Sequence, residues 1–230
     1  MAEKSERLNK FLALQLGISR RQADELISNG RISINGKKAE LGTRFFDGDE
    51  IKLGEKIISS ERQKNIYLLF NKPRGFVCSR KKQGENETIY AILPKKYHSL
   101  KPVGRLDKDS SGLILLTNDG DFAFRMTHPK FRKIKEYLVE IDQPLAPLHQ
   151  QMIADFGVNL PDGKSQLGLE RLDEPRRKWK VIMSEGRNRQ IRRTFAAVGY
   201  EVKALHRTVF GAYTLPDNLN FGDFEEVAKK

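Results

Sequence analysis

The stretch from Leu113 to Thr117 constrains the fold most, because it is an apolar run without a polar side chain before its last residue. Its length suits a strand, and a strand without polar alternation is buried on both faces. Further strand patterns lie at residues 66–70, 76–79, 136–141 and 179–184. Few long helical patterns separate them, so we expect an α+β fold with a mixed, mostly antiparallel sheet flanked by helices.

Charge is the strongest bulk signal of this chain. Its 230 residues carry a formal net charge of +12, and most of the excess lies after residue 64. Such an excess favours a polyanionic partner, because each Lys or Arg that neutralises a phosphate releases condensed counterions. No membrane-spanning or secretory pattern occurs, and Cys78 is the only cysteine. We therefore expect a cytoplasmic protein that does not act on membranes.

Residues 1–58 predict a small module of two helices and short strands. Apolar residues repeat with helical spacing between Leu8 and Leu16, and Ser19 with Gln22 forms a capping-box pattern for a second helix. The dipeptide Asn35-Gly36 is typical of a type I′ hairpin. The exposed side of this module is expected to carry five basic residues: Arg20, Arg21, Arg31, Lys37 and Lys38.

The segment from Arg7 to about Leu53, with its GISRRQADELISNGRISINGK pattern, resembles an S4 RNA-binding domain. In that domain the second helix and the loop after it rest on structured RNA, so the resemblance implies that the five basic residues contact RNA. A generic helix pair with solvated arginines is the alternative. The polar residues 59–64 are expected to be a linker to a second domain, residues 65–230.

Three interpretations compete for the segment from Gly104 to Gly120. A calcium loop fits the first six positions from Asp107, but position nine is Leu115 and position twelve is Asn118, where a bidentate Glu is needed. A turn explains Asp109, since Asp, Ser and Gly favour turns, but it does not explain the Arg-x-Asp pair before it.

An active site is the third interpretation of this segment. The buried strand that follows would hold the base of the loop rigid. A carboxylate fixed there in a dry pocket needs a cationic partner to stay ionised. Asp107 and Arg105 are the residues that this interpretation explains best.

The stretch GRLDKDSSGLILLTNDG resembles the catalytic motif of the pseudouridine synthases, in the subfamily that carries an S4 domain and modifies ribosomal RNA. The resemblance implies that Asp107 is catalytic and that ribosomal RNA or a pre-ribosomal particle is the partner. It implies neither a cofactor nor a metal ion. Ser110 stands where most relatives have threonine, and both supply a hydroxyl group. The Asp107–Ser110 variant resembles the large-subunit members, so we expect a target in 23S ribosomal RNA.

The target base must leave the RNA stack before it can react, which requires a stacking surface and a group that fills the gap. Residues 133–142 alternate as a strand, with Tyr137 on the inner face. The resemblance implies that Tyr137 stacks on the base and that Leu205 lines the uracil pocket; core packing is the alternative for both. Arg105 is expected to occupy the vacated space or to hold a flanking phosphate.

Residues 185–202 predict a helix whose apolar face includes Ile191. Arg192 lies at the boundary of that face, so it is expected to bend inward and pair with Asp107, as the resemblance also implies. Asn71–Gly75 resembles the first motif of the family. Further RNA contacts are expected from Lys72, Arg74, Arg187, Arg189 and Arg193.

Two other function classes stay open. A non-catalytic S4-type RNA-binding protein of ribosome assembly would have no need of an ionised carboxylate sequestered with an arginine, so Asp107 argues against it. A metal-dependent nuclease would use Asp107, Asp109, Asp119 and Asp121. An extended strand rises about 3.3 Å per residue, which would keep the first and last of these apart. We expect a monomer.

Overall fold

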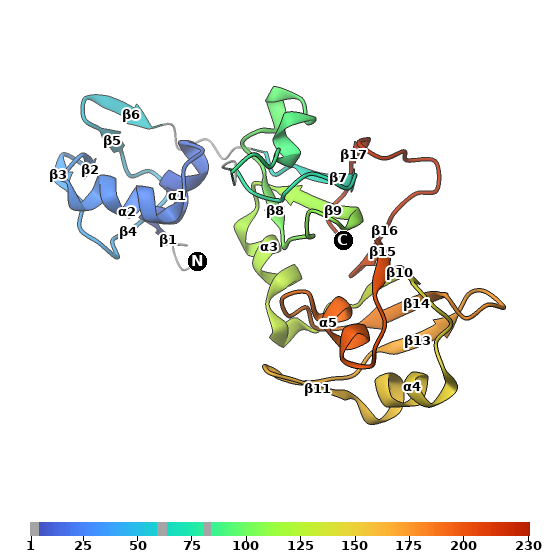
Figure 1. The fold of residues 1–230 in the computed structure, drawn as a ribbon. Coiled ribbons are helices and arrows are strands. Elements are labelled where there is room, and N and C mark those ends of the chain that lie inside the picture. Colours follow the sequence, from blue (N-terminus) through green and yellow to red (C-terminus); the bar gives the residue numbers. More distant parts are fainter. Residues whose placement is uncertain (1–4, 59–63, 81–83) are drawn as a thin grey trace. The chain divides into compact units, whose positions relative to one another are not determined.

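The computed structural model describes residues 5–58, 64–80 and 84–230. Its contacts divide the chain into two compact units, residues 1–65 and 66–230 (Figure 1). Most of the expected linker, residues 59–63, lies outside the described residues. Within the described part, no helix combines the length and the apolar character that crossing a membrane requires.

The N-terminal unit forms as its local signals predict. The Ser19 hydroxyl accepts a hydrogen bond from the Gln22 amide at 3.1 Å, and Gln22 Oε1 accepts one from the Ser19 amide at 2.9 Å, which confirms the capping box. Asn35 and Gly36 both have positive φ (49° and 79°), as a type I′ turn requires. The helices are α1 (Leu8–Gln15) and α2 (Arg20–Ser28). The strands are β1 (Glu6–Arg7), β2 (Ile32–Ile34), β3 (Lys37–Lys38), β4 (Arg44–Phe45), β5 (Ile51–Leu53) and β6 (Lys56–Ile58).

The C-terminal unit is built on a mixed sheet, which has nine strands within the described residues. The order is β13-β14-β10-β15-β9-β7-β17, with β8 beside β9 and β16 beside β15. Its strands are β7 (Tyr67–Lys72), β8 (Lys101–Val103), β9 (Ser111–Thr117), β10 (Lys135–Ile141), β13 (Gly168–Arg171), β14 (Lys178–Met183), β15 (Val202–Phe210), β16 (Tyr213–Thr214) and β17 (Phe224–Glu226). Strand β9 runs parallel to β15, and the other described pairs of this sheet are antiparallel. The predicted mixed, mostly antiparallel sheet is therefore confirmed.

Short helices and one hairpin complete this unit. The helices are α3 (Gly120–Thr127), α4 (Pro147–Gln151) and α5 (Gln190–Ala197). The 3₁₀ turns are η1 (Ile89–Ala91), η2 (Lys95–Tyr97) and η3 (Pro129–Phe131), and η4 (Met152–Phe156) is a π-helical turn. The hairpin pairs β11 (Val158–Leu160) with β12 (Gly163–Ser165).

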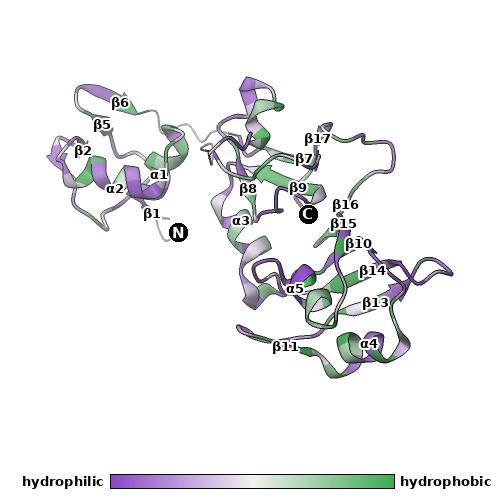
Figure 2. Ribbon diagram, in the orientation of Figure 1, coloured by the Kyte–Doolittle hydropathy of each residue, from purple (hydrophilic) through white to green (hydrophobic). Residues whose placement is uncertain are grey.

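Strand β9 is buried on both faces, as its apolar run predicts. Figure 2 shows it as a hydrophobic segment. Ile114 and Leu116 belong to the core that also contains Ile191 and Phe195 of α5. Leu113 and Leu115 belong to a second core, together with Phe122 and Met126 of α3. Each fully buried leucine or isoleucine contributes about 1.5–3 kcal/mol. The strand that carries the Asp107 loop is thus fixed from both sides.

The prediction of a strand at residues 76–79 is wrong. This segment forms one isolated bridge, between Val77 and Thr88. Strand β7, which precedes it in the chain, is already paired on one edge with β9 and on the other with β17. Because both edges of β7 are occupied, the segment after the turn at Gly75 cannot fold back and pair with β7.

Gly112 allows the close approach of β9 to β15, where it lies opposite Arg207. Its φ is +103°, and a Cβ atom there would lie 2.3 Å from the Arg207 carbonyl oxygen. A side chain at this position would force the two strands apart. The glycine therefore sets the distance between the Asp107 loop and the side chains of β15.

Candidate active site

The loop that carries Asp107 is a turn held from below by a buried lysine. The Ser110 amide donates to the Asp107 carbonyl oxygen at 3.1 Å, which closes the turn. The Lys72 ammonium donates to the carbonyl oxygens of Pro73, Asp107 and Ser110, at 2.9, 3.1 and 2.7 Å. The turn interpretation and the site interpretation therefore apply to the same residues.

Lys72 is 0% exposed, and burial lowers the pKa of its ammonium group. The predicted contact of Lys72 with RNA is wrong, because its side chain ends inside the protein on three backbone carbonyl groups. Its role is to fix the backbone beneath Asp107. Arg74, in the same segment, is exposed and donates to the Lys203 carbonyl oxygen at 3.0 Å.

A cavity of about 410 Å³ opens above this turn. Four of the five residues that sequence reasoning placed in the active site line it, namely Arg105, Asp107, Tyr137 and Leu205; the fifth, Arg192, does not. The loop before β9 supplies the first two, β10 supplies Tyr137 and β15 supplies Leu205. The volume lies within the usual range of about 300–1,000 Å³ for small-ligand pockets.

The alternation predicted for β10 is confirmed, with Tyr137 and Val139 buried and Leu138 exposed. Tyr137 is 7% exposed, and among the described residues its hydroxyl group forms no hydrogen bond. A tyrosine that served only the core would be expected to have a partner for this group. The arrangement therefore favours a ring that faces the cavity. Leu205 is equally buried, at 7% exposed, and adds an apolar wall.

Arg189, and not Arg192, forms the ion pair with Asp107. The distance from Arg189 Nη1 to Asp107 Oδ2 is 3.5 Å. Arg192 does bend inward, but its guanidinium group donates to the carbonyl oxygens of Val202 at 2.6 Å and of Asp109 at 3.1 Å. The prediction failed because Arg189 precedes the helix as its N-cap in a left-handed conformation, with φ 48° and ψ 32°. Helical spacing does not apply to such a residue.

The pocket around Asp107 is not dry, contrary to the expectation. The Asp107 side chain is 36% exposed and that of Arg189 is 45% exposed. An ion pair so open to water adds little stability, about 0–1 kcal/mol. Separating Arg189 from Asp107 therefore costs little free energy.

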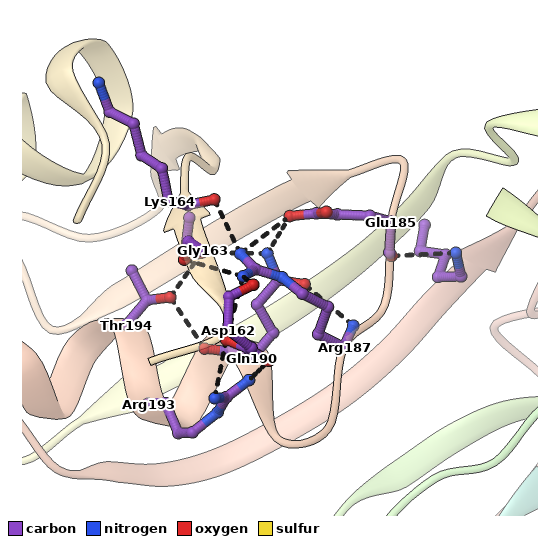
Figure 3. Close-up of polar contacts among 10 residues, drawn as sticks. Asp162, Gly163, Lys164, Glu185, Arg187, Gln190, Arg193 and Thr194 are labelled. Carbon is purple, nitrogen blue, oxygen red and sulfur yellow. Dashed lines mark hydrogen bonds and ion pairs between the residues drawn. The ribbon is translucent and has the colours of Figure 1, made fainter. Parts of the chain in front are cut away.

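Arg187 and Arg193 are bound to the β11–β12 hairpin, which argues against the predicted phosphate contacts of both (Figure 3). Arg193 donates to both carboxylate oxygens of Asp162, at 3.0 and 2.7 Å. Arg187 donates to Asp162 Oδ1 at 3.0 Å and to the carbonyl oxygens of Gly163 and Lys164 at 2.8 and 2.9 Å. These bonds fix the hairpin to α5 and so support one wall of the cavity.

Lys135 is a cavity residue that sequence reasoning missed. Its ammonium group donates to the carbonyl oxygens of Glu185 at 3.1 Å and Lys133 at 3.3 Å. Burial, followed by repulsion from Arg207, lowers the pKa of Lys135 to about 8. The signal was present in the sequence, because Lys135 lies two residues before Tyr137 and therefore on the same face of β10.

Arg207 is the second missed residue, two positions after Leu205 on β15. It is 2% exposed, its Nε donates to the Leu113 carbonyl oxygen at 2.7 Å, and its guanidinium lies 4.7 Å from the centre of the Phe210 ring. Its Nη2 atom is buried and has no hydrogen-bond partner among the described residues. A buried charged donor without an acceptor is costly, so this atom is suited to a substrate oxygen.

The cavity as a whole is cationic. Six Lys or Arg side chains line it against two acidic ones, Asp107 and Glu185. Such a lining attracts a polyanion and leaves one carboxylate beside the bound group. The five basic residues of the N-terminal unit are likewise exposed, on α2, on the loop after it and on β3. They are available to a second part of the same polyanion.

The four aspartates of the nuclease interpretation do not converge. Asp119 caps α3 by accepting from the Phe122 amide at 2.9 Å, and it also accepts from the Tyr67 hydroxyl at 2.8 Å and the Lys229 ammonium at 2.7 Å. It therefore serves the fold, at the far end of β9 from Asp107. Among residues 5–58, 64–80 and 84–230, no three His, Cys, Asp or Glu side chains are grouped so that they could hold a metal ion.

Comparison with known proteins identifies the family of this chain. Residues 66–197 match the family model of RNA pseudouridylate synthase, and residues 6–51 match that of the S4 domain. The chain belongs to the RNA pseudouridylate synthase family. The predicted enzyme class, the S4 domain and the expected α+β fold are thereby confirmed.

Relatives in this family align over nearly the whole chain. A protein of Aquifex aeolicus named as an uncharacterized RNA pseudouridine synthase is 34% identical and covers 97% of this chain and 93% of its own length. The ribosomal large subunit pseudouridine synthase B of Bacillus subtilis is 35% identical, over 96% of this chain and 92% of the relative. The ribosomal small subunit pseudouridine synthase A of Yersinia pestis is also 35% identical, over 96% and 97%.

A crystal structure of a pseudouridylate synthase has the same fold. It superposes on this chain with a TM-score of 0.68 at 33% identity, and the match covers 96% of both chains. The reaction of the family breaks the bond between the sugar of a uridine in RNA and a nitrogen of its base. It then joins the same sugar to a carbon of that base. A pocket with one carboxylate, an aromatic wall and a cationic rim is consistent with that chemistry.

Proposed function

We propose that this protein converts a uridine of ribosomal RNA to pseudouridine, with Asp107 as the catalytic carboxylate. The observation that carries the proposal is the position of Asp107. It lies on a turn fixed by Lys72, in a cavity that Tyr137 and Leu205 also line. A protein that only bound RNA would not need a carboxylate in a cationic pocket, where it repels phosphates.

The half-exposed Asp107 suits the chemical role that we assign to it. Breaking the bond between base and ribose can begin with attack of the carboxylate on the base, attack on the sugar carbon, or removal of a ribose proton. All three paths require an ionised carboxylate next to the nucleoside. In the free protein Arg189 pairs with Asp107, at 3.5 Å between Nη1 and Oδ2.

The other cavity residues supply binding and orientation in this proposal. The uridine must be flipped out of its stack, which costs a few kcal/mol, so the site has to replace the lost contacts. The ring of Tyr137 takes over the stacking, Leu205 closes the apolar side, and Arg105 at the rim holds the flanking backbone. Arg207 Nη2 is the buried donor for an oxygen of the base.

Ribosomal RNA is the proposed substrate because two of the relatives that align over almost the whole chain are named for ribosomal subunits. Their identities to this chain are both 35%, so identity does not choose between the subunits. We propose the large-subunit RNA, on the resemblance of the Asp107–Ser110 segment to that group. The S4 unit, with its exposed arginines and lysines, selects the site by RNA shape. We place the enzyme in the cytoplasm, as a monomer.

The proposal is tested by mapping pseudouridine in ribosomal RNA from cells that lack the protein, with and without re-supply of the wild type. We expect one or a few sites in large-subunit RNA to disappear and to return with the wild type. A lost site in small-subunit RNA would correct the substrate. Unchanged maps would contradict the proposed activity and favour the assembly factor instead.

A further inference from the structure

Residues 122–135, which contribute to one wall of the cavity, form a strongly basic segment to which the proposed function assigns no role. These fourteen residues include five Lys or Arg and no Asp or Glu. They form the last part of α3, the turn η3 and the start of β10. In a chain in which 30 of 230 residues are acidic, an uninterrupted basic stretch along a cavity wall favours contact with a polyanion.

Three aromatic side chains gather on this wall and are named here the aromatic rim: Phe124, His128 and Phe131. The ring centres of Phe124 and His128 are 4.7 Å apart, those of Phe124 and Phe131 are 5.8 Å apart, and those of His128 and Phe131 are 6.3 Å apart. Phe124 is 47% exposed. A large aromatic side chain so open to water is expected to have a partner when it stands in a cluster.

The aromatic rim is continuous with the catalytic cavity. His128 lines that cavity, together with Thr127 and with Pro129, the first residue of η3, and it contacts the rings of both phenylalanines. Whatever leaves the cavity on this side therefore passes over the rim. Since the target uridine remains covalently joined to its neighbours, one adjacent nucleotide must leave the cavity with its base unstacked.

Cations lie where the phosphates of such a nucleotide would be. The Lys130 ammonium is 4.9 Å from the centre of the Phe131 ring and 5.4 Å from that of Phe124. Arg125, Lys130 and Arg132 are exposed, and no ion pair within the described part of the chain involves them. Aromatic rings interleaved with unpaired cations are how proteins hold single-stranded nucleic acid.

We propose that the aromatic rim binds the nucleotide next to the target uridine: its base stacks on the exposed ring of Phe124, against which Phe131 packs nearly at a right angle, while Lys130 and its basic neighbours hold its phosphate. This inference rests on the proposed function only in naming the RNA as substrate. It assigns a second base-binding position outside the catalytic cavity. The flipped strand is then held at two points, which positions the uridine over Asp107.

The test compares the binding of a single-stranded decamer of oligouridylate to the full chain, by fluorescence anisotropy at several salt concentrations. The double variant Phe124→Leu/Phe131→Leu keeps apolar side chains and removes the stacking faces. We expect it to bind about 5- to 150-fold more weakly, as the loss of stacking for one base implies. Its salt dependence should equal that of the wild type, because no charge is removed.

Lys130→Gln should show the opposite pattern, a salt slope lower by about 0.7, as expected for one lost phosphate contact with a single strand. Phe156→Leu is the matched control, because Phe156 is 64% exposed and does not line the cavity. The fluorescence of Trp179, the only tryptophan of the sequence, verifies that each variant is folded.

The inference is overturned if the double phenylalanine variant binds the decamer as tightly as Phe156→Leu does. The rim would then be a surface for a protein partner or a cluster that serves only the fold. The outcome does not depend on catalysis. If the wild type forms no pseudouridine and the double variant still loses affinity, the stacking site stands and the proposed activity fails.

Discussion

Replacing Lys72 with methionine tests how the catalytic turn is held. Methionine retains most of the apolar stem and removes the ammonium group that donates to the carbonyl oxygens of Pro73, Asp107 and Ser110. All three carbonyl groups lose this side-chain donor, and the Asp107 oxygen keeps a backbone donor, the Ser110 amide. The backbone beneath the carboxylate is then free to shift.

The magnitude follows from two opposing contributions. Three hydrogen bonds from a charged donor give a gross contribution of roughly 5–9 kcal/mol, at about 1.5–3 kcal/mol each. Burial of the ammonium group costs several kcal/mol, and it is the same burial that lowers the pKa of Lys72. We therefore expect Lys72→Met to lower the free energy of unfolding by ~2–4 kcal/mol. A displacement of about 1 Å at Asp107 would lower kcat roughly 10²-fold.

Urea unfolding followed by Trp179 fluorescence measures this effect in the C-terminal unit alone, because the chain has no other tryptophan. Pseudouridine formation under saturating RNA gives kcat, and RNA affinity should change less than about threefold, since no exposed cation is removed. Lys178→Met, at the exposed first residue of β14, is the matched control. Unfolding within about 0.5 kcal/mol of the wild type, together with full kcat, would refute the role of Lys72 as the support of the turn.

Three further predictions concern charged groups of the same unit. Arg189→Gln should lower kcat/KM more than Arg192→Gln does, because within the described residues Arg189 is the one that forms an ion pair with Asp107; the reverse order in steady-state kinetics would contradict the pairing. The pKa of Lys135 is lowered to about 8, so its cationic form prevails below that pH and kcat/KM should fall above it. Lys135→Arg should move this fall to higher pH, and an unchanged profile would exclude Lys135 from substrate binding. Burial would raise the pKa of Asp119, but hydrogen bonds from Lys229, the Phe122 amide and Tyr67 outweigh it and lower the pKa to about 2. Its ionised form therefore stabilises the fold above about pH 4, the range of an unperturbed aspartate, and this contribution is lost as the pH falls to 2. At pH 7 the free energy of unfolding of Asp119→Asn should be lower than that of the wild type. Over that acid range it should fall less than the free energy of unfolding of the wild type does, as measured by urea titrations.

Local signals explain the elements that the sequence predicted correctly. Ser19 with Gln22, and Asn35 with Gly36, act over at most four residues, so their geometry is independent of the rest of the chain. The apolar run of β9 and the alternation around Tyr137 likewise report burial of consecutive residues. Such patterns survive because the tertiary structure reinforces them.

The errors concern contacts between distant residues. Arg187 and Arg193 bind Asp162, which is 25 and 31 positions away, and no pattern in the sequence links the two segments. Lys72 was taken for a surface cation because its three acceptors are backbone groups, which every residue has. The segment at residues 76–79 has strand composition, but whether it pairs depends on which sheet edges are free.

The resemblance to a known family predicted more of the site residues than the spacing of residues in the sequence did. Asp107, Tyr137 and Leu205 do line one cavity, yet Lys135 and Arg207 line it too and were not named. Both lie two positions from a residue that was named, on the same face of the same strand. Strict use of the two-residue period along β10 and β15 would have found them.

The most direct test of the account replaces Asp107 with asparagine, which keeps the shape of the side chain and removes its charge. The purified wild type and Asp107→Asn are compared for pseudouridine formation in the ribosomal RNA site found by mapping, and for RNA affinity at fixed salt. We expect no pseudouridine from the variant, while its affinity is equal to that of the wild type or higher, because a negative charge has left a cationic pocket. Pseudouridine formed by the variant at the wild-type rate would contradict the catalytic role of Asp107.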